Sequence, residues 1–328
     1  MTTAELLESL AWPGPDCRFS GFSFAIGDAW ETRHLGSGGR VAKGSETDVN
    51  PDALFDLASV TKLYTATLAA KLHEAGEIDL DSPLSYWSDI AGPLGTKTAR
   101  SLLTHSSGLA PEWVEKVSRE ATIESLLSQT PRVEQEGKLV YSCTGYTLFS
   151  VALERKYGRK FDDLVSEHLL EPLGLKKTTY NPNPAFFSIA DAKSAEEQFP
   201  FGLVHDPRAR AMDGVSGNAG LFATATDVFS FFSEVVTGRS SVVNDAARRE
   251  LFTPTVSGEW QQAIGFRHQD SARLGARSNY FSHTGFTGTL VMVDPATSKV
   301  AVLLTNRLQC GTTREQMAVV YSSFASSF

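Results

Sequence analysis

Segments that alternate apolar and polar residues lie at both ends of this chain, and segments with helical periodicity lie between them. Near the N-terminus, the alternation resumes after Gly27-Asp28, which predicts a hairpin over residues 22–34. Near the C-terminus, four strands are predicted, at Ala263–His268, Tyr280–Thr284, Thr287–Val293 and Val300–Thr305. These strands bury their apolar faces by sharing one sheet, so the two ends of the chain are expected to meet.

The middle of the chain is predicted to be helical. One apolar stripe, Val60, Leu63, Tyr64, Leu68 and Leu72, predicts a helix that ends near Gly76. Further helices are expected at residues 122–129, 145–157 and 162–170, from Thr224 to Gly238, and through Met317 and Phe324, with a loop over residues 181–200. The predicted fold is an α/β (α+β) fold with a mainly antiparallel sheet flanked by helices. It divides into a sheet domain of residues 15–55 plus 206–328 and an inserted helical domain of residues 56–205.

Composition excludes several classes of function. The chain has 328 residues and a net charge of -8, which argues against binding to nucleic acid or to anionic membranes. No apolar run reaches membrane-spanning length, and no Lys or Arg precedes Arg18, so no signal peptide is predicted. Cys17, Cys143 and Cys310 are far apart and odd in number, and no disulfide framework or zinc pattern fits them. A reducing, cytoplasmic location is therefore expected.

The first candidate for chemistry is Ser59-Val60-Thr61-Lys62. Residues three apart on a helix lie one turn apart on one face, so Lys62 can reach the Ser59 hydroxyl. A serine hydroxyl becomes a good nucleophile when a base takes its proton. A lysine can act as that base if burial or a neighbouring cation lowers its pKa towards neutrality. This S-x-x-K spacing alone is weak, because about one such match arises by chance in a chain of this length.

Further segments place this pair in a family context. Phe55-Asp56-Leu57-Ala58-Ser59-Val60-Thr61-Lys62 resembles the nucleophile segment of the serine β-lactamase and penicillin-binding-protein superfamily. The likeness is greatest to the branch that holds class C β-lactamases, DD-peptidases and related (family VIII-type) esterases. Three segments in the same order resemble other motifs of that family: Leu102-Leu103-Thr104-His105-Ser106-Ser107-Gly108-Leu109, Tyr141-Ser142-Cys143-Thr144-Gly145-Tyr146 and His283-Thr284-Gly285. The resemblance spans roughly residues 20 to 325.

The resemblance implies a role for each matching residue. Ser59 is expected to be the acylated nucleophile, Lys62 its partner base, and Tyr141 the group that shares the proton and passes it to the leaving group. The backbone N–H groups of Ser59 and Phe286 are expected to form the oxyanion hole. Substrate contacts are expected from the residues that line the cleft, namely Cys143, His283, Thr284, Gly285 and Phe286.

Two positions depart from the family pattern. The tyrosine segment usually reads Tyr-x-Asn, and Cys143 stands at the third place, where a thiol donates and accepts hydrogen bonds poorly. A buried, inert thiol is the simplest interpretation of Cys143. His283 replaces the lysine common in β-lactamases, which weakens the expected hold on a substrate carboxylate. Arg307 is a candidate substitute, although a surface arginine is the simpler interpretation.

Three functions fit the sequence. The favoured one is a serine hydrolase that acts on small esters or amides. The first alternative is a β-lactamase or D-Ala-D-Ala-type peptidase, and the second is a non-catalytic relative that binds an acyl ligand or a partner. No cofactor or metal is expected, because Walker, G-x-G-x-x-G and H-E-x-x-H motifs are absent from the sequence. The expected partner is a small acyl substrate, and the sequence does not indicate an oligomeric state.

Overall fold

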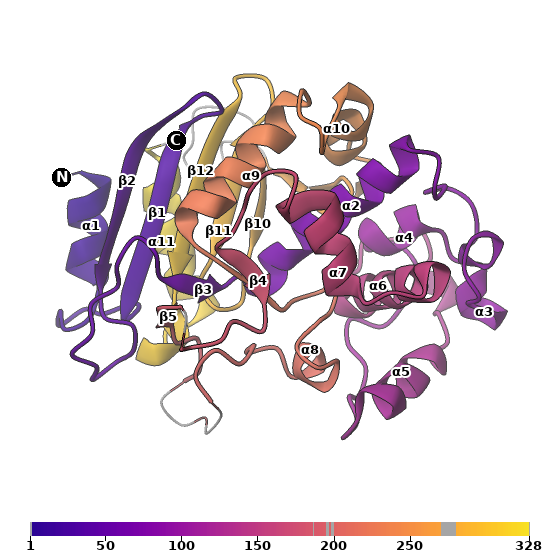
Figure 1. The fold of residues 1–328 in the computed structure, drawn as a ribbon, viewed down its shortest axis with the longest axis horizontal. Coiled ribbons are helices and arrows are strands. Elements are labelled where there is room, and N and C mark those ends of the chain that lie inside the picture. Colours follow the sequence, from indigo (N-terminus) through magenta and orange to yellow (C-terminus); the bar gives the residue numbers. More distant parts are fainter. Residues whose placement is uncertain (1, 186, 195–196, 198–199, 270–279, 328) are drawn as a thin grey trace.

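An eight-stranded sheet forms one side of the computed structural model, which describes residues 2–185, 187–194, 197, 200–269 and 280–327 (Figure 1). Its strand order is β2-β1-β12-β11-β10-β9-β8-β7, and β1 pairs antiparallel with β12. This pairing confirms that strands from the two ends of the chain share one sheet. The strands are β1 (Gly21–Asp28), β2 (Glu31–Gly39), β7 (Val256–Ser257), β8 (Gln261–Gln262), β9 (Arg267–Gln269), β10 (Tyr280–Thr284), β11 (Leu290–Asp294) and β12 (Lys299–Thr305).

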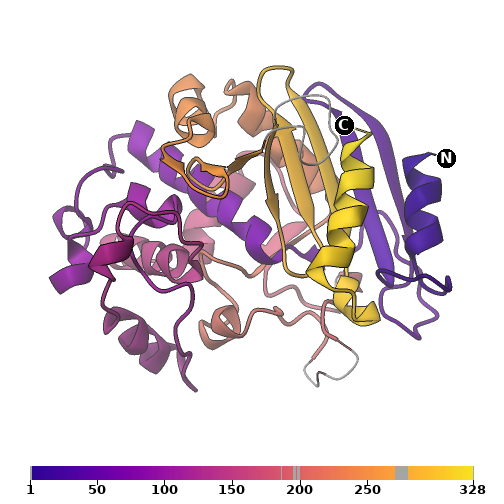
Figure 2. The ribbon, with the colours of Figure 1, turned by 180° about the vertical axis from the view of Figure 1, so that it is seen from behind.

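Helices cover both faces of this sheet. Helix α9 (Ala225–Thr237) crosses one face, where Ala25 and Val302 belong to the same buried cluster as Phe231. Helices α1 (Thr3–Leu10) and α11 (Arg314–Ala325) lie on the other face, seen in Figure 2. There Phe24 packs against Phe324 with ring centroids 6.3 Å apart. The period-two alternation that predicted the strands therefore divides their side chains between two helical layers.

The helical side of the molecule adjoins the sheet through α2 (Thr61–Glu74) and α10 (Asp245–Phe252). Predicted helices are confirmed as α2, α5 (Arg119–Leu127), α6 (Cys143–Tyr157), α9 and α11, and residues 162–170 form α7 (Phe161–Val165) and a π-helical turn (Ser166–Leu170). The short helices that the sequence did not predict are α1, α3 (Gly92–Gly95), α4 (Ala99–Leu103), α8 (Pro207–Ala211) and α10. Single 3-10 turns lie at Ala58–Val60, Leu84–Tyr86, Val133–Gln135 and Arg307–Cys310.

A second, small sheet lies between the two sides. Its order is β4-β6-β3-β5, with β3 (Leu54–Asp56), β4 (Thr178–Tyr180), β5 (Ile189–Ala190) and β6 (Leu221–Ala223). Strand β5 falls within residues 181–200, which were expected to form only a loop. Strands β4 and β5 belong to the inserted part and β6 to the sheet part, so this sheet joins the two. The proposed division at residues 56 and 205 remains a prediction.

One predicted strand is wrong over most of its length. Residues 263–266 form a turn between β8 and β9, in which the Ala263 N–H donates to the Phe266 carbonyl at 2.9 Å. Gly265 has φ +78°, a backbone conformation that glycine adopts readily. Ala263, Ile264 and Phe266 are nevertheless fully buried. The alternating pattern therefore predicted correctly that these residues are buried, but the strand that it predicted does not form over residues 263–266.

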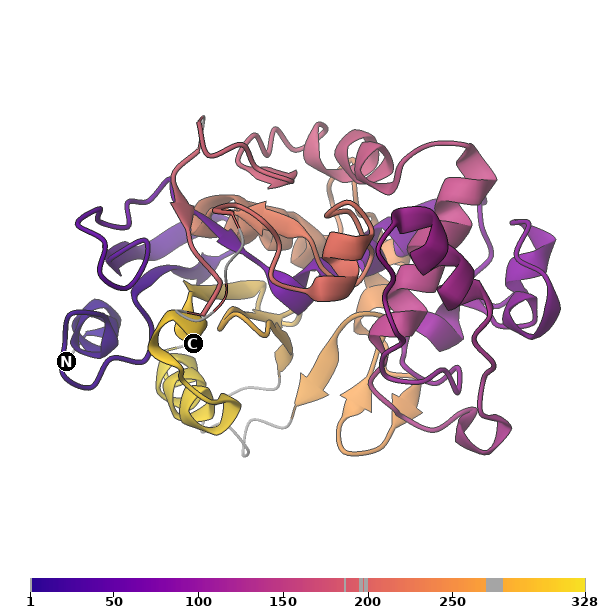
Figure 3. The same cartoon turned by 90° about the horizontal axis from the view of Figure 1, so that it is seen from below.

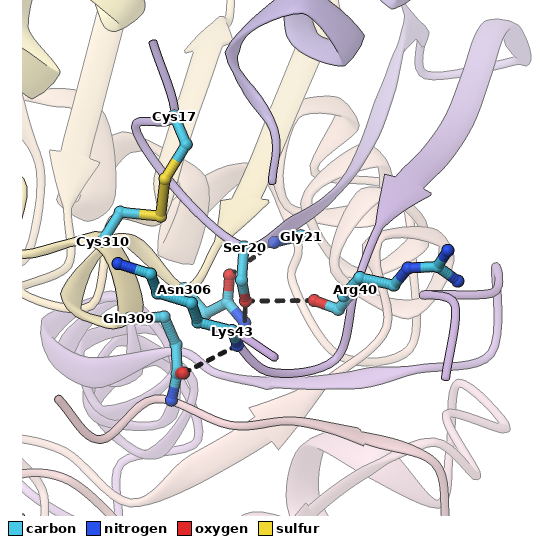
Figure 4. Close-up of a disulfide and its surroundings, with 8 residues drawn as sticks. All are labelled: Cys17, Ser20, Gly21, Arg40, Lys43, Asn306, Gln309 and Cys310. Atoms are coloured by element: carbon cyan, nitrogen blue, oxygen red, sulfur yellow. Dashed lines mark hydrogen bonds between the residues drawn. A yellow bond between two sulfur atoms is a disulfide. The ribbon is translucent and has the colours of Figure 1, made fainter. Parts of the chain in front are cut away.

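The expectation that the cysteines form no disulfide is also wrong. Cys17 and Cys310 are bonded (Figure 4), although 293 positions separate them, because the two ends of the chain fold side by side. Asn306 reinforces the junction: its Oδ1 accepts from the Gly21 N–H and its Nδ2 donates to Ser20 Oγ, both at 2.7 Å. Spacing along the sequence could not reveal this pairing. None of the described helices combines the length and the apolar character that crossing a membrane requires.

We predict that the Cys17–Cys310 bond contributes about 2–5 kcal/mol to the free energy of unfolding, the usual range for a native disulfide. Denaturant titration of the protein with and without reductant measures this difference. Unfolded under non-reducing conditions, each chain should expose a single reactive thiol, that of Cys143, and reduction should expose all three. A Cys143→Ser variant is the control and should expose none before reduction. Three thiols without reductant would contradict the prediction.

Candidate functional site

Ser59 lies in the 3-10 turn Ala58–Val60, directly before α2, and Lys62 lies in the first turn of that helix. The Lys62 ammonium donates a hydrogen bond to Ser59 Oγ at 2.9 Å, the contact that the S-x-x-K spacing predicted. It also donates to the main-chain carbonyl of Asn218 at 2.9 Å. Lys62 is fully buried and Ser59 is half-buried, so the hydroxyl alone of this pair faces the solvent side.

The turn between β10 and β11 holds the segment that precedes Ser59. Thr287 Oγ1 donates to the Asp56 carbonyl at 2.7 Å, and Thr289 Oγ1 donates to the Leu57 carbonyl at 3.0 Å. Gly285 is needed for this close approach, because a Cβ at that position would lie 2.6 Å from the Leu57 carbonyl oxygen. The C-terminal sheet therefore fixes where α2 begins.

The Asp56 side chain supports an unusual backbone conformation beside Ser59. Ala58 has φ +45°, a region that residues with a Cβ rarely adopt and that is kept only when the surroundings stabilise it. Asp56 Oδ1 accepts from the Ala58 N–H at 2.8 Å, and its Oδ2 accepts from the His205 N–H at 2.7 Å. Burial raises the pKa of the Asp56 carboxyl, and the hydrogen bonds from these two N–H groups partly oppose that rise.

Tyr141 lies at the meeting point of four side chains. The Lys62 ammonium is 5.3 Å from its ring centroid and the Arg267 guanidinium carbon is 4.9 Å from it. The rings of His105 and His283 lie 4.5 Å and 6.0 Å from the Tyr141 ring, centroid to centroid. Two cations and two imidazoles therefore surround the phenol that the sequence indicated.

Both imidazoles are neutral at pH 7. Burial lowers the pKa of His105 and of His283 well below the usual range, and the positive charges of Lys62 and Arg267 lower it further. His283 was expected to line the cleft, but it is not among the described residues that line the cavity. Its neighbours Ser282 and Thr284 face the cavity, while His283 is buried on the opposite face of β10 with its Nδ1 bonded to the Thr284 carbonyl.

The charge state of Lys62 differs from the sequence-based expectation. Burial acts to lower its pKa, but interactions with Cys143 and Tyr141, including a hydrogen bond with Tyr141, outweigh burial and raise the pKa. Groups that can carry negative charge stabilise the ammonium. Lys62 is therefore protonated at neutral pH.

A cavity of about 700 Å³ opens above Ser59. Figure 3 shows the ribbon from below, with the yellow C-terminal segments and the magenta helices on different sides. The cavity is lined from both, by Thr284 of β10 and by Cys143 of α6. Seven of the residues singled out in the sequence line it: Ser59, Tyr141, Cys143, Thr284, Gly285, Phe286 and Arg307. Cys143 is a buried free thiol at the first position of α6, as expected for its burial.

Several arginines of the cavity were missed or misjudged from the sequence. Arg267 comes from β9 and was not singled out. Arg307 was expected at the surface, yet it is 4% exposed and donates from Nε to the Phe286 carbonyl at 2.7 Å. Arg314, from α11, also lines the cavity, with its guanidinium 5.0 Å from the Phe286 ring. These contacts join distant parts of the chain, so local patterns carried no signal for them.

A family model and curated relatives of this chain point to the same protein family. The family model described as "Beta-lactamase" matches residues 4–322. The "N-acetylmuramyl-L-alanine amidase" of Bacillus subtilis (strain 168) is 34% identical over 77% of this chain and 68% of its own length. A "Putative D-alanyl-D-alanine carboxypeptidase" of Escherichia coli (strain K12) is 28% identical over 77% of this chain and 69% of its own.

Solved structures share the fold. "EstCE1, a hydrolase with promiscuous acyltransferase activity" superposes with a TM-score of 0.78 at 19% identity, covering 99% of this chain and 96% of its own. A class C beta lactamase from Rhodobacter sphaeroides gives a TM-score of 0.76 at 20% identity, with 94% of each chain covered. Within the described ranges, no group of three or more His, Cys, Asp or Glu side chains is arranged to hold a metal ion.

We predict that Asp56→Asn lowers both stability and the rate of ester hydrolysis. An amide has one acceptor oxygen, so the N–H of Ala58 or of His205 loses its partner, at a cost of about 1–3 kcal/mol. Thermal melting measures the first effect and kcat for an activated ester measures the second. Asp227→Asn is the matched control, because Asp227 accepts the Lys177 N–H outside the cavity. It should lower the melting temperature and leave kcat unchanged; equal kcat values for the two variants would contradict the prediction.

Proposed function

The chain belongs to the beta-lactamase family and is a serine hydrolase, and from this we propose that it hydrolyses small esters or amides through a covalent acyl group on Ser59. The observation that carries this proposal is the hydrogen bond of 2.9 Å from Lys62 to Ser59 Oγ, at the floor of a cavity that also contains Tyr141. A covalent acyl-enzyme is general in the family, so the proposal concerns which residues form it and on what substrate.

We assign the proton transfers to Tyr141. Because the pKa of Lys62 is raised, its ammonium holds Ser59 Oγ in place and stabilises an anionic phenol nearby. As Oγ bonds to the acyl carbon, the Ser59 proton passes to the Tyr141 oxygen. When the tetrahedral intermediate collapses, Tyr141 gives that proton to the leaving oxygen or nitrogen. The same groups, with water as the nucleophile, release the acyl product.

Two backbone N–H groups are proposed to stabilise the developing oxyanion. The N–H of Ser59 lies at the start of α2, and the N–H of Phe286 follows Gly285 in the turn that holds the nucleophile segment. Donors fixed in this way stabilise negative charge that appears only during the reaction. Because Thr287 and Thr289 join the two segments, the spacing of the two donors is set by the fold.

Substrate selection is proposed to favour simple esters over β-lactams. Cys143 replaces an amide on the cavity wall, so a substrate amide loses a hydrogen-bond partner worth about 0.5–1.5 kcal/mol. His283 is neutral and lies behind the wall, so it supplies no charge to a substrate carboxylate. A simple ester needs neither contact.

A D-Ala-D-Ala-type carboxypeptidase is the second candidate function. The observation that favours it is the pair Arg307 and Arg314, whose guanidinium carbons lie 4.7 Å and 5.0 Å from the Phe286 ring on one wall of the cavity. Cations at that position suit a substrate with a terminal carboxylate. The names of the Escherichia coli and Bacillus subtilis relatives point to cell-wall peptides as well. A non-catalytic role has no observation in its favour.

The cellular location is a separate proposal. The cytoplasmic location expected from the sequence rested partly on the absence of a disulfide, and the Cys17–Cys310 bond counts against it. Disulfides persist mainly in oxidising compartments. We therefore infer a site of action outside the reducing cytoplasm, where cell-wall peptides are also found.

We predict that wild-type protein exposed to p-nitrophenyl acetate gains the mass of one acetyl group, located on Ser59 by peptide mapping, and that Ser59→Ala gains none. The variant should melt near the wild-type temperature, because the hydroxyl faces the cavity. Intact-protein mass spectrometry after rapid acid quenching gives the result. Thr61→Ser, which keeps a hydroxyl two residues away, is the control and should still acylate. Wild-type turnover by Ser59→Ala would exclude the proposal.

We also predict the order of kcat/KM among three substrates on one preparation: a p-nitrophenyl ester first, an N-acylated D-Ala-D-Ala peptide second, and a chromogenic cephalosporin lowest. The gap between ester and cephalosporin should be on the order of a hundredfold, from two lost polar contacts at about tenfold each. Arg307→Gln should lower kcat/KM for the peptide more than for the uncharged ester. Higher efficiency on the cephalosporin would overturn the order, and a peptide that exceeds the ester would favour the carboxypeptidase.

A further inference from the structure

Arg267 is held between two aromatic rings on the cavity wall. Its guanidinium carbon lies 4.4 Å from the Trp260 ring centroid and 4.9 Å from that of Tyr141. The strand that carries it, β9, pairs with β10, so that Arg267 stands opposite Ser282. Contact with two ring faces fixes the plane of the guanidinium, and an arginine keeps its charge at any physiological pH.

Among the described residues, this cation contacts aromatic rings and forms no ion pair with a carboxylate. In the described part of the chain, no carboxylate lies within ion-pair distance of Arg267, and its buried Nε has no hydrogen-bond partner. The negative charge of Glu259 acts to raise the pKa of Arg267, and the positive charge of Arg314 acts to lower it. Its field therefore acts on both rings, and of the two only that of Tyr141 carries a group that can become an anion.

In the described part of the chain, titratable groups from several elements lie near Tyr141. They are Lys62 of α2, His105 after α4, Cys143 and Tyr146 of α6, Arg267 of β9 and His283 of β10. The two histidines are neutral, and burial raises the pKa of Tyr146 well above its usual value, so this phenol is neutral too. Among these groups, Lys62 and Arg267 carry the positive charge.

We propose that Arg267 is a positioning residue for catalysis, which stabilises the anionic form of Tyr141 so that this phenol can accept the proton of Ser59. The inference rests on the proposed function of Ser59 and Tyr141. Lys62 already donates to Ser59 Oγ and to the Asn218 carbonyl. The Nε of Arg267 has no hydrogen-bond partner among the described residues, and its guanidinium adds a second positive charge 4.9 Å from the centroid of the Tyr141 ring.

The effect is large enough to measure. A unit charge about 5 Å from an ionisable group favours its anionic form by about tenfold or more, for an effective dielectric constant between those of water and of a protein interior. Removing the positive charge makes an anionic phenol less favourable, so Tyr141 accepts the Ser59 proton less readily. The acid limb of the pH–rate profile, which reports the base of the free enzyme, then moves to higher pH.

The test is kcat/KM against pH for p-nitrophenyl acetate, a substrate without charge, with wild type, Arg267→Gln and Arg267→Lys. Arg267→Gln should move the midpoint of the acid limb up by about 1 pH unit and recover much of its rate at high pH. Arg267→Lys keeps the charge, and should stay within about half a unit of wild type. An unmoved midpoint in Arg267→Gln overturns the proposal, as does a midpoint in Arg267→Lys that equals that of Arg267→Gln.

Arg208→Gln is the matched control. Arg208 lines the same cavity but stacks on Trp113, at 6.0 Å, so its loss should leave the midpoint unchanged. If Arg267→Gln does not fold, His283→Lys replaces it, because this variant adds a cation beside Tyr141 instead of removing one. The midpoint of the acid limb should then move to lower pH. A midpoint that stays or rises overturns the proposal. Absence of acylation on Ser59 at every pH would instead refute the proposed function itself.

Discussion

Two threonine hydroxyls join parts of the chain that are more than 200 residues apart. They hold the segment before Ser59 against the turn between β10 and β11, and so fix two walls of the cavity relative to each other. Thr287 and Thr289 bind the carbonyls of Asp56 and Leu57, across sequence separations of 231 and 232 residues. The turn that carries these threonines also carries Phe286, and the segment that they hold leads into Ser59. The candidate nucleophile and the proposed oxyanion donor therefore move as one unit, although they come from opposite ends of the sequence.

The buried cations of the site are solvated by neutral oxygens. Lys62 donates to a main-chain carbonyl and a hydroxyl, and Arg307 donates to the carbonyls of Phe286 and Thr312. A carboxylate partner would cancel most of the charge, whereas a carbonyl dipole stabilises it and leaves its field intact. The cavity is thus preorganised for negative charge before any substrate arrives, which is the arrangement that acyl transfer requires.

Sequence patterns predicted what depends on neighbours along the chain and missed what depends on distant ones. The Ser59–Lys62 contact follows from helical spacing, and the shared sheet follows from alternation at both ends. Alternation also implies that His283 faces away from its neighbours Ser282 and Thr284, but not which face of β10 borders the cavity. The aromatic stacking of Arg267 could not be predicted, because it depends on how β9 meets Tyr141 in space.

The disulfide near the chain ends makes most of the molecule a closed covalent ring, from Cys17 to Cys310. Peptide continuity is therefore not the sole covalent connection between the two halves of the large sheet. A protease that cuts one loop inside the ring leaves a single molecule, with β1 and β12 still linked and paired. Thr3 and Ser327 are also hydrogen-bonded outside the ring, at 2.9 Å. Such a protein can survive nicking in a protease-rich environment for as long as its one disulfide stays oxidised.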